Sequence, residues 1–278
     1  MPRTIRVSHS PDSDDAFMFY ALAEGLIDTG DLRYEHELQD IESLNQRALK
    51  GELEVTALSI HAYAYVADRY ALLPHGASMG DRYGPRLVTR EARSLEDLRG
   101  RRIAVPGLLT SAYLALRLAE PSFEAVPTPF DQIEDVVLKG EVDAGLLIHE
   151  GQLTYGSAGL HLVLDLGEWW FGETGLPLPL GGNVVRKDLG SDLVRDISRH
   201  LRASIDYALR HRAPAIDHAM RYARGLDRAQ ADTFVGMYVN EWTRDYGEPG
   251  RRSVRLFLER GVKAGIIPHP VTVEFVED

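Results

Sequence analysis

The sequence predicts an α/β protein with two lobes and a ligand cleft between them. The chain has 278 residues, which is long enough for two modest domains. Strand and helix patterns alternate in two successive blocks, and this alternation is typical of α/β lobes. Two extended segments, residues 85–90 and 180–187, allow the chain to cross between lobes twice. We therefore expect residues 1–87 plus 187–278 to form the large lobe and residues 88–186 the small one.

The first block begins with a short strand at residues 5–7, followed by a polar loop. In that loop Asp14 or Asp15 can cap a helix over residues 16–23, because carboxylates accept the first free N–H groups of a helix. The next elements follow the same logic: a strand at 33–38, a helix from Ile41 capped by Asp40 and closed by Gly51, a strand at 55–58, a helix from Ser59 through Tyr65, and a strand at 86–89.

The second block repeats the pattern from residue 102. A strand at 102–105 leads through Pro106 and Gly107 to a helix that Thr110 or Ser111 can cap. The remaining elements of this block are a helix at 130–139 with Gly140 after it, an apolar strand at 144–148 that ends at His149, and strands at 162–164 and 183–185.

The chain becomes helical after Gly190. Apolar residues recur at every fourth position, which predicts an amphipathic helix over Leu193, Ile197, Leu201, Ile205 and Leu209. Three further helices are expected: one near Pro214, one capped by Asp227, and one over residues 253–264.

The composition excludes several classes of function. Acidic residues number 42 against 31 Lys and Arg, and the net charge of −11 disfavours binding to nucleic acids or anionic membranes. The absence of cysteine excludes disulfides, thiolate metal sites and thiol nucleophiles. Residues 1–15 contain no apolar run of signal-peptide length, and no window approaches the roughly 20 apolar residues of a membrane span. We expect a cytoplasmic protein.

Ligands of open α/β sheets bind beyond the carboxyl ends of the strands, and this rule selects the loops that can form a site. At residues 107–112 a glycine precedes Thr110 and Ser111 at a helix start, where N–H groups and hydroxyls suit a carboxylate. Ordinary helix capping explains the same residues. His149 follows an apolar strand and can accept a proton near neutral pH, although a hydrogen-bonded interfacial histidine is the alternative. Glu150 can orient it or cap the next helix.

Other patterns carry weaker information. Residues 10–17, SPDSDDAF, are interpreted as a turn and helix cap, with binding of a polyhydroxy ligand second; a calcium loop would need a glycine and a closing Glu. Residues 76–80 match GxSxG, but no helix can follow directly, so the match is attributed to chance. The aromatic residues 169–171 can cover a lobe edge or form the wall of a pocket for a ring, but core packing is the preferred interpretation. The histidines have no metal-ligand spacing, and there is no P-loop or GxGxxG motif, so no metal or nucleotide site is expected.

Five stretches together carry a resemblance that covers nearly the whole chain. They are residues 40–64, 84–90 (GPRLVTR), 104–116 (AVPGLLTSAYLAL), 140–155 (GEVDAGLLIHEGQLTY) and 165–183 (DLGEWWFGETGLPLPLGGN). With them the sequence resembles the 1,4-dihydroxy-6-naphthoate synthases of the futalosine route to menaquinone. That family shares its periplasmic-binding-protein-like (type II) clamp with chorismate dehydratase and type II solute-binding proteins.

The resemblance implies a lyase that needs no cofactor and has His149 as general base. Its substrate is cyclic de-hypoxanthine futalosine, a small carboxylate, which loses a three-carbon fragment and leaves dihydroxynaphthoate. Matching positions and cleft-facing loops together give the expected substrate-binding set: Ser10, Asp40, Ala57, Leu58, Ser59, Thr110, Ser111, Ala112 and Asn183.

The chain departs from the family pattern near its N-terminus. The family usually reads SPCPNDTF where this chain reads SPDSDDAF, so Asp14 replaces Asn and Ala16 replaces Thr. Ser111 also stands where Thr is common. The additional carboxylates would repel an anionic substrate. Two other functions therefore stay open: a non-catalytic protein that binds a small carboxylate, and a chorismate dehydratase.

Overall fold

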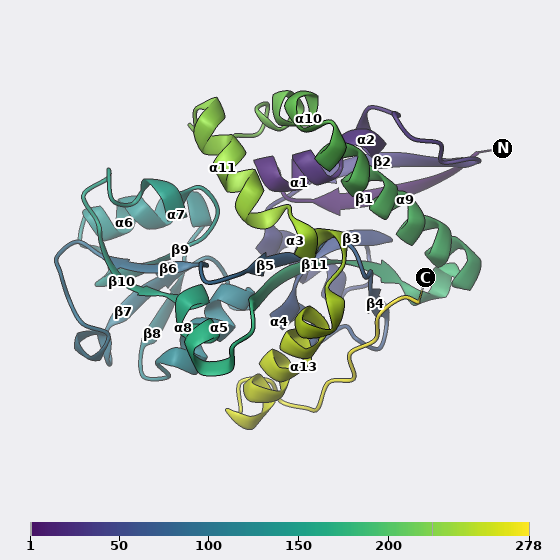
Figure 1. Ribbon diagram of the computed structural model, residues 1–278. Helices are drawn as coiled ribbons and strands as arrows, with labels where there is room; N and C mark the ends of the chain where they lie inside the picture. Colours follow the sequence, from purple (N-terminus) through teal and green to yellow (C-terminus); the bar gives the residue numbers. More distant parts are fainter. Residues whose placement is uncertain (1, 224, 278) are drawn as a thin grey trace.

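The computed structural model describes residues 2–223 and 225–277, whose strands form two sheets (Figure 1). The first sheet has the order β2-β1-β3-β11-β4, with β5 pairing β11, and the second has the order β10-β6-β9-β7-β8. The strands of the first sheet are β1 (Arg3–His9), β2 (Leu32–Leu38), β3 (Val55–Ser59), β4 (Tyr70–Leu72), β5 (Ser78–Gly80) and β11 (Leu178–Arg186). Those of the second are β6 (Arg86–Thr89), β7 (Arg102–Val105), β8 (Glu124–Pro127), β9 (Ala144–Leu147) and β10 (His161–Asp165).

The two sheets confirm the predicted pair of α/β lobes. Figure 1 shows the second sheet in teal at one side of the first. The chain passes from one sheet to the other in residues 81–85 and returns in residues 175–177. Strand β11 pairs antiparallel with β3, so residues 178–186 lie beside the N-terminal strands, although the predicted division assigns them to the small lobe. The limits of the lobes as domains stay a prediction.

Helices cover the sheets and connect their strands. Those before the return crossing are α1 (Ser13–Met18), α2 (Tyr20–Ala23), α3 (Ile41–Leu49), α4 (Ile60–Tyr63), α5 (Ser111–Ala119), α6 (Ile133–Leu138), α7 (Gly151–Thr154) and α8 (Leu166–Thr174). Those after it are α9 (Ser191–Arg210), α10 (Arg212–Ala219), α11 (Arg228–Tyr238), α12 (Glu241–Arg244) and α13 (Gly247–Lys263). No helix among these described residues is long and apolar enough to cross a membrane.

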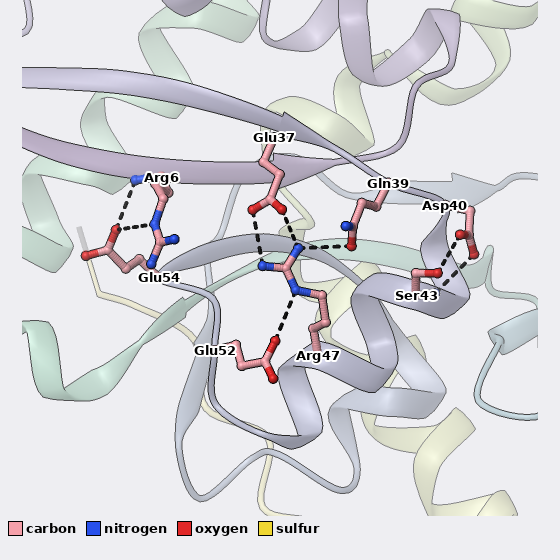
Figure 2. Close-up of polar contacts among 8 residues, drawn as sticks. All are labelled: Arg6, Glu37, Gln39, Asp40, Ser43, Arg47, Glu52 and Glu54. Atoms are coloured by element: carbon pink, nitrogen blue, oxygen red, sulfur yellow. Dashed lines mark hydrogen bonds and ion pairs between the residues drawn. The ribbon is translucent and has the colours of Figure 1, made fainter.

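Side-chain caps fix where several of these helices begin. Asp40 caps α3 as predicted, because its carboxylate accepts the N–H of Ser43 at 3.0 Å (Figure 2). Arg47 near the end of α3 bonds Glu37 on β2 and Glu52 after the helix, which ties the helix to the sheet (Figure 2). Helix α11 likewise begins at its predicted cap, Asp227.

The expected start of the first helix is wrong. Asp12, and neither Asp14 nor Asp15, is the N-cap of α1, because it has extended backbone and its carboxylate accepts the N–H of Asp15. The single helix expected over residues 16–23 is instead two short helices, α1 and α2, that meet at Phe19. The carboxylates of Asp14 and Asp15 are thereby placed in the first turn.

One apolar core runs through both lobes. It joins Leu58 and Leu72 of the first sheet to Ile103 and Leu146 of the second. Trp170 on α8 is a fully buried member of this core. The indole of Trp170 donates to Ser253 Oγ on α13 at 3.0 Å, so the core assignment of the aromatic run is confirmed for this residue. On the side of α5, α8 and α13 the two lobes are packed together.

Candidate active site

A cavity lies where the carboxyl ends of strands from both sheets face each other. It holds about 740 Å³, including its opening to solvent. The lining residues come from the first lobe, the second lobe and helix α11: Ser10, Asp12, Asp14, Asp15, Met18, Ile41, Ala57, Leu58, Ser59, Gly76, Ser78, Pro85, Thr110, Ser111, Ala112, Ile148, His149, Gln152, Leu180, Gly181, Gly182, Asn183, Phe234 and Tyr238.

The structure brings together nearly all residues that the sequence singled out. His149 lines the cavity together with Ser10, Ala57, Leu58, Ser59, Thr110, Ser111, Ala112 and Asn183. Asp40 is not among the lining residues: both of its carboxylate oxygens bond Ser43, and its neighbour Ile41 reaches the cavity instead. Asp40 therefore caps a helix in this structure, which corrects its expected place in the site.

His149 lies two residues beyond the end of β9, with its backbone in the left-handed region at φ 52°. Few non-glycine residues adopt this conformation, and it turns the chain sharply at the strand end. The ring Nδ1 lies 3.1 Å from Oδ2 of Asp12, and the His149 side chain remains 17% exposed. Phe130 packs edge-on against the imidazole at 4.9 Å between ring centroids. The histidine is thus held on two sides and still borders the cavity.

Three carboxylates at the start of α1 have different protonation behaviour. Burial alone would raise the pKa of Asp12, but the hydrogen bond and charge of His149 lower it to about 2. Burial and then the negative charge of Asp12 raise the pKa values of Asp14 and Asp15 well above their usual range. Asp12 is therefore the ionised member of the group.

Ser59 is fixed at the end of β3 by a residue that the sequence analysis missed. The amide of Asn45 on α3 donates to Ser59 Oγ at 3.0 Å and accepts the Ser59 N–H at 3.0 Å. Asn45 is fully buried, so both bonds are shielded from water. A buried Asn on the sheet-facing side of a predicted helix is the signal that could have revealed it.

The N-terminus of α5 faces the same cavity. Thr110 caps this helix by accepting the N–H of Tyr113 at 3.2 Å, which selects Thr110 over Ser111. Ser111 and Ala112 occupy the first turn, where backbone N–H groups have no partner inside the helix. Among the described lining residues there is no Lys or Arg. A bound carboxylate would therefore rely on N–H groups, hydroxyls and the helix dipole.

Asn183 on β11 offers a further polar contact. Its Oδ1 is buried without a hydrogen-bond partner, whereas its Nδ2 donates to the Gly76 carbonyl at 3.1 Å. Gly76 has φ 82°, and a Cβ there would lie 2.3 Å from Nδ2 of Asn183, so only glycine fits. The neighbouring Ser78 lies in strand β5 and lines the cavity; it is not a nucleophile elbow, as expected.

Helices α7 and α11 close the cavity from opposite lobes and were not expected to do so. The Gln152 side-chain amide on α7 lies 2.6 Å from the hydroxyl oxygen of Tyr238 on α11. Phe234, one turn earlier on α11, adds an apolar wall. Among the described residues no group of three His, Asp or Glu is arranged to hold a metal ion.

The sequence matches the family model described as menaquinone biosynthesis over residues 5–263. The chain belongs to the menaquinone biosynthesis family. Two members of the family are curated as 1,4-dihydroxy-6-naphthoate synthases. The Thermus thermophilus protein is 43% identical over 96% of this chain and 97% of its own length. The Streptomyces coelicolor protein is 40% identical over 95% of each chain.

Solved structures place the family in a common fold. A crystal structure of an Archaeoglobus fulgidus protein is 49% identical, with a TM-score of 0.91 over 95% of this chain and 98% of that one. The alkanesulfonate-binding protein of Xanthomonas axonopodis, solved with MOPS, has a TM-score of 0.72 at 15% identity, covering 98% and 96% of the two chains. A Candida albicans protein with the generic periplasmic-binding-protein fold has a TM-score of 0.67 at 14% identity over 99% of each chain. The expected periplasmic-binding-protein-like fold is confirmed.

Proposed function

We propose that this menaquinone-biosynthesis protein is a 1,4-dihydroxy-6-naphthoate synthase, a carbon–carbon lyase that acts on cyclic de-hypoxanthine futalosine. The observation that carries the proposal is the position of His149, which borders a cavity between the lobes and has Nδ1 on a carboxylate. The two curated relatives support the assignment, because they are similar to this chain over nearly their full length.

His149 acts in this proposal as the general base. With Nδ1 engaged by Asp12, Nε2 is the ring nitrogen that can take a proton from the substrate. Loss of the three-carbon fragment leaves an aromatic naphthoate, which supplies much of the driving force. The protein then has to position the substrate and stabilise developing charge.

The remaining cavity residues would hold the substrate. The N-terminus of α5, with Thr110, Ser111 and Ala112, suits the carboxylate. Ser59 and Asn183 suit hydroxyl groups, because one is fixed by Asn45 and the other has a free buried acceptor. Asp40 has no part in this set.

Replacing His149 with Asn tests the proposal. Asn tolerates the left-handed backbone at this position better than Ala, so the variant removes the base with little added strain. We expect kcat for naphthoate formation to fall by about 10²- to 10⁴-fold. His269→Asn, at an exposed histidine, is the matched control and should keep full activity.

Three results would contradict the proposal. Wild-type turnover by the His149→Asn variant would remove His149 from the chemistry. Conversion of chorismate by the wild-type protein, or binding of the futalosine substrate without naphthoate formation, would favour the other functions considered above. Assays of the purified protein on both substrates, followed by chromatography, distinguish these results.

A further inference from the structure

We propose that Asp12 is the positioning residue for His149 and that it completes the base from the opposite lobe only when the lobes are together. This inference rests on the proposed role of His149 as general base. Asp12 lies between β1 and α1 of the first lobe, whereas His149 follows β9 of the second. In the run SPDSDDAF at residues 10–17, Asp12 is the first of three carboxylates.

Both oxygens of Asp12 have a defined partner. Oδ1 accepts the N–H of Asp15 at 3.4 Å in the first turn of α1, and Oδ2 lies 3.1 Å from Nδ1 of His149. The Asp12 side chain is only 4% exposed, so water does not compete for these contacts. The helix cap therefore fixes the carboxylate, and the carboxylate in turn fixes the imidazole.

The contact with Asp12 determines which nitrogen of the His149 imidazole carries the proton. An ionised carboxylate only accepts hydrogen bonds, so it requires a proton on Nδ1 and leaves the lone pair on Nε2. The same carboxylate stabilises the imidazolium that forms when Nε2 takes a proton, as a buried Asp does for the histidine of a serine-protease triad. A neutral acceptor in place of Asp12 would not supply this charge.

Among the charged residues near His149, Asp12 is the one that can act as its ionised partner. Asp14 and Asp15 lie in the first turn of the same helix, and burial followed by the charge of Asp12 raises their pKa values. Glu150 follows His149 in the second lobe. After the effect of His149, the hydrogen bond of Asp14 and the charge of His9 on β1 lower the pKa of Asp12 further. Carboxyls whose pKa values diverge inside one site take different roles, and Asp12 is the ionised one.

The position of the two residues couples the base to lobe closure. Asp12 follows a strand of the first sheet and His149 follows a strand of the second, so their contact crosses between the lobes. Opening the cavity on this side would separate Oδ2 from Nδ1. The base is then complete only around an enclosed substrate, which keeps proton transfer away from water.

The test compares Asp12→Asn with Asp12→Ser in the full-length protein. Asn keeps the size and the helix cap but loses the charge, and Ser keeps the cap but cannot reach His149. We expect both variants to fold, kcat to fall at least about 10²-fold, and KM to stay within a few-fold. The acid limb of the kcat profile should move to lower pH, because the imidazolium loses its partner. Asp227→Asn, the same change at the exposed cap of α11, should change none of these quantities.

A measurement on His149 itself separates this inference from the proposed function. Nitrogen-15 NMR of the imidazole, assigned with His149→Asn, should show the Nδ1–H form in the wild type and a lower His149 pKa in Asp12→Asn. An active wild type with unchanged kcat and pH profile in both Asp12 variants would overturn the inference. An unchanged His149 titration would overturn it even if the wild-type protein did not form naphthoate, a result that would contradict only the proposed function.

Discussion

At the scale of single residues, the site depends on buried side chains that hold other polar groups in place by hydrogen bonds. Asn45 is the clearest case, since it bonds both the hydroxyl and the N–H of Ser59. Replacing Asn45 with Leu keeps the branched shape and the number of side-chain heavy atoms but leaves these groups unpaired. We expect the free energy of unfolding to fall by about 1–3 kcal/mol and KM to rise, measured by urea unfolding and steady-state kinetics.

The effect of Asn45 can be separated from a general loss of packing. Ser59→Ala removes one of the two bonds, so a double-mutant cycle with Asn45→Leu should give a coupling energy well above zero. Additive effects of the two substitutions would show that Asn45 does not position Ser59.

A pair of histidines makes stability depend on pH. His9 Nε2 lies 3.1 Å from His36 Nδ1, and His9 stacks on Phe19. Burial, followed by the neighbouring His36, lowers the pKa of His9 to about 4; burial, followed by His218, lowers that of His36 to about 4. In the unfolded chain these two histidines therefore bind protons below about pH 6.5, whereas in the folded protein they become protonated only near pH 4.

Protonation of this histidine pair should destabilise the folded protein. The free energy of unfolding should fall as pH falls from 6.5 towards 4, by at most about 2.7 kcal/mol per pH unit for the pair, because the unfolded state binds more protons. The carboxylate of Asp12 adds its own loss only below about pH 4, because its pKa is lowered. Urea unfolding at several pH values gives the change in the free energy of unfolding per pH unit. His36→Gln should reduce this change, whereas His269→Gln at the surface should not. Equal pH dependence in the wild type and His36→Gln would contradict the assignment to this pair.

At the scale of elements, helix α5 shows how one cap can serve both folding and binding. Thr110 Oγ1 accepts the Tyr113 N–H and donates to the Gly107 carbonyl at 2.8 Å. Thr110→Ala should lower stability by about 1 kcal/mol and raise KM, and Thr110→Ser should restore both. Thermal unfolding and kinetics check this; a KM that rises equally in the Ser variant would mean that the methyl group, not the hydroxyl, matters.

The elements that the sequence predicted well are those with strong local patterns. The four-residue spacing of Ile197, Leu201 and Ile205 identified α9, and caps such as Asp40 located helix starts. Strands β4, β5 and β8 were missed because β4 has no polar residue to show alternation, β5 ends in glycine and β8 ends in proline. Helix α8 was missed because aromatic residues cover several of its sides, so it has no clear polar face.

The site was predictable as a set of loops but not as a set of contacts. The rule about strand ends brought His149, Ser59 and Asn183 to one cavity. It could not show that Asp12 touches His149, because that contact joins residues 137 positions apart through the packing of two lobes. It also misassigned Asp40, since a cap and a ligand contact need the same kind of side chain.

At the scale of the whole molecule, the lobes share a core instead of meeting only through linkers. Trp170, Phe257 and Leu146 belong to one buried cluster that includes residues of both sheets. We therefore expect a single cooperative transition in calorimetry, with equal calorimetric and van't Hoff enthalpies. Two separate transitions would show that the lobes unfold independently.

A substitution in the shared core tests the same point. Trp170→Ala should destabilise the protein by about 3–5 kcal/mol and lower the melting temperature of both lobes together. Leu108→Ala, at an exposed leucine, is a control that should change stability little. Loss of structure confined to the second lobe, seen by hydrogen exchange, would contradict a common core. The predicted cytoplasmic location is independent of these measurements and stays a prediction.

The packed side formed by α5, α8 and α13 also decides how molecules travel to and from the cavity. That flank is filled by Trp170 and its neighbours, whereas residues of α1, α7 and α11 line the cavity on its other side. We expect substrate and product to pass on this second side, because the packed flank leaves no room for them. Bound naphthoate would then block entry of the next substrate molecule. Release of the product, not the cleavage step, would limit turnover when product accumulates.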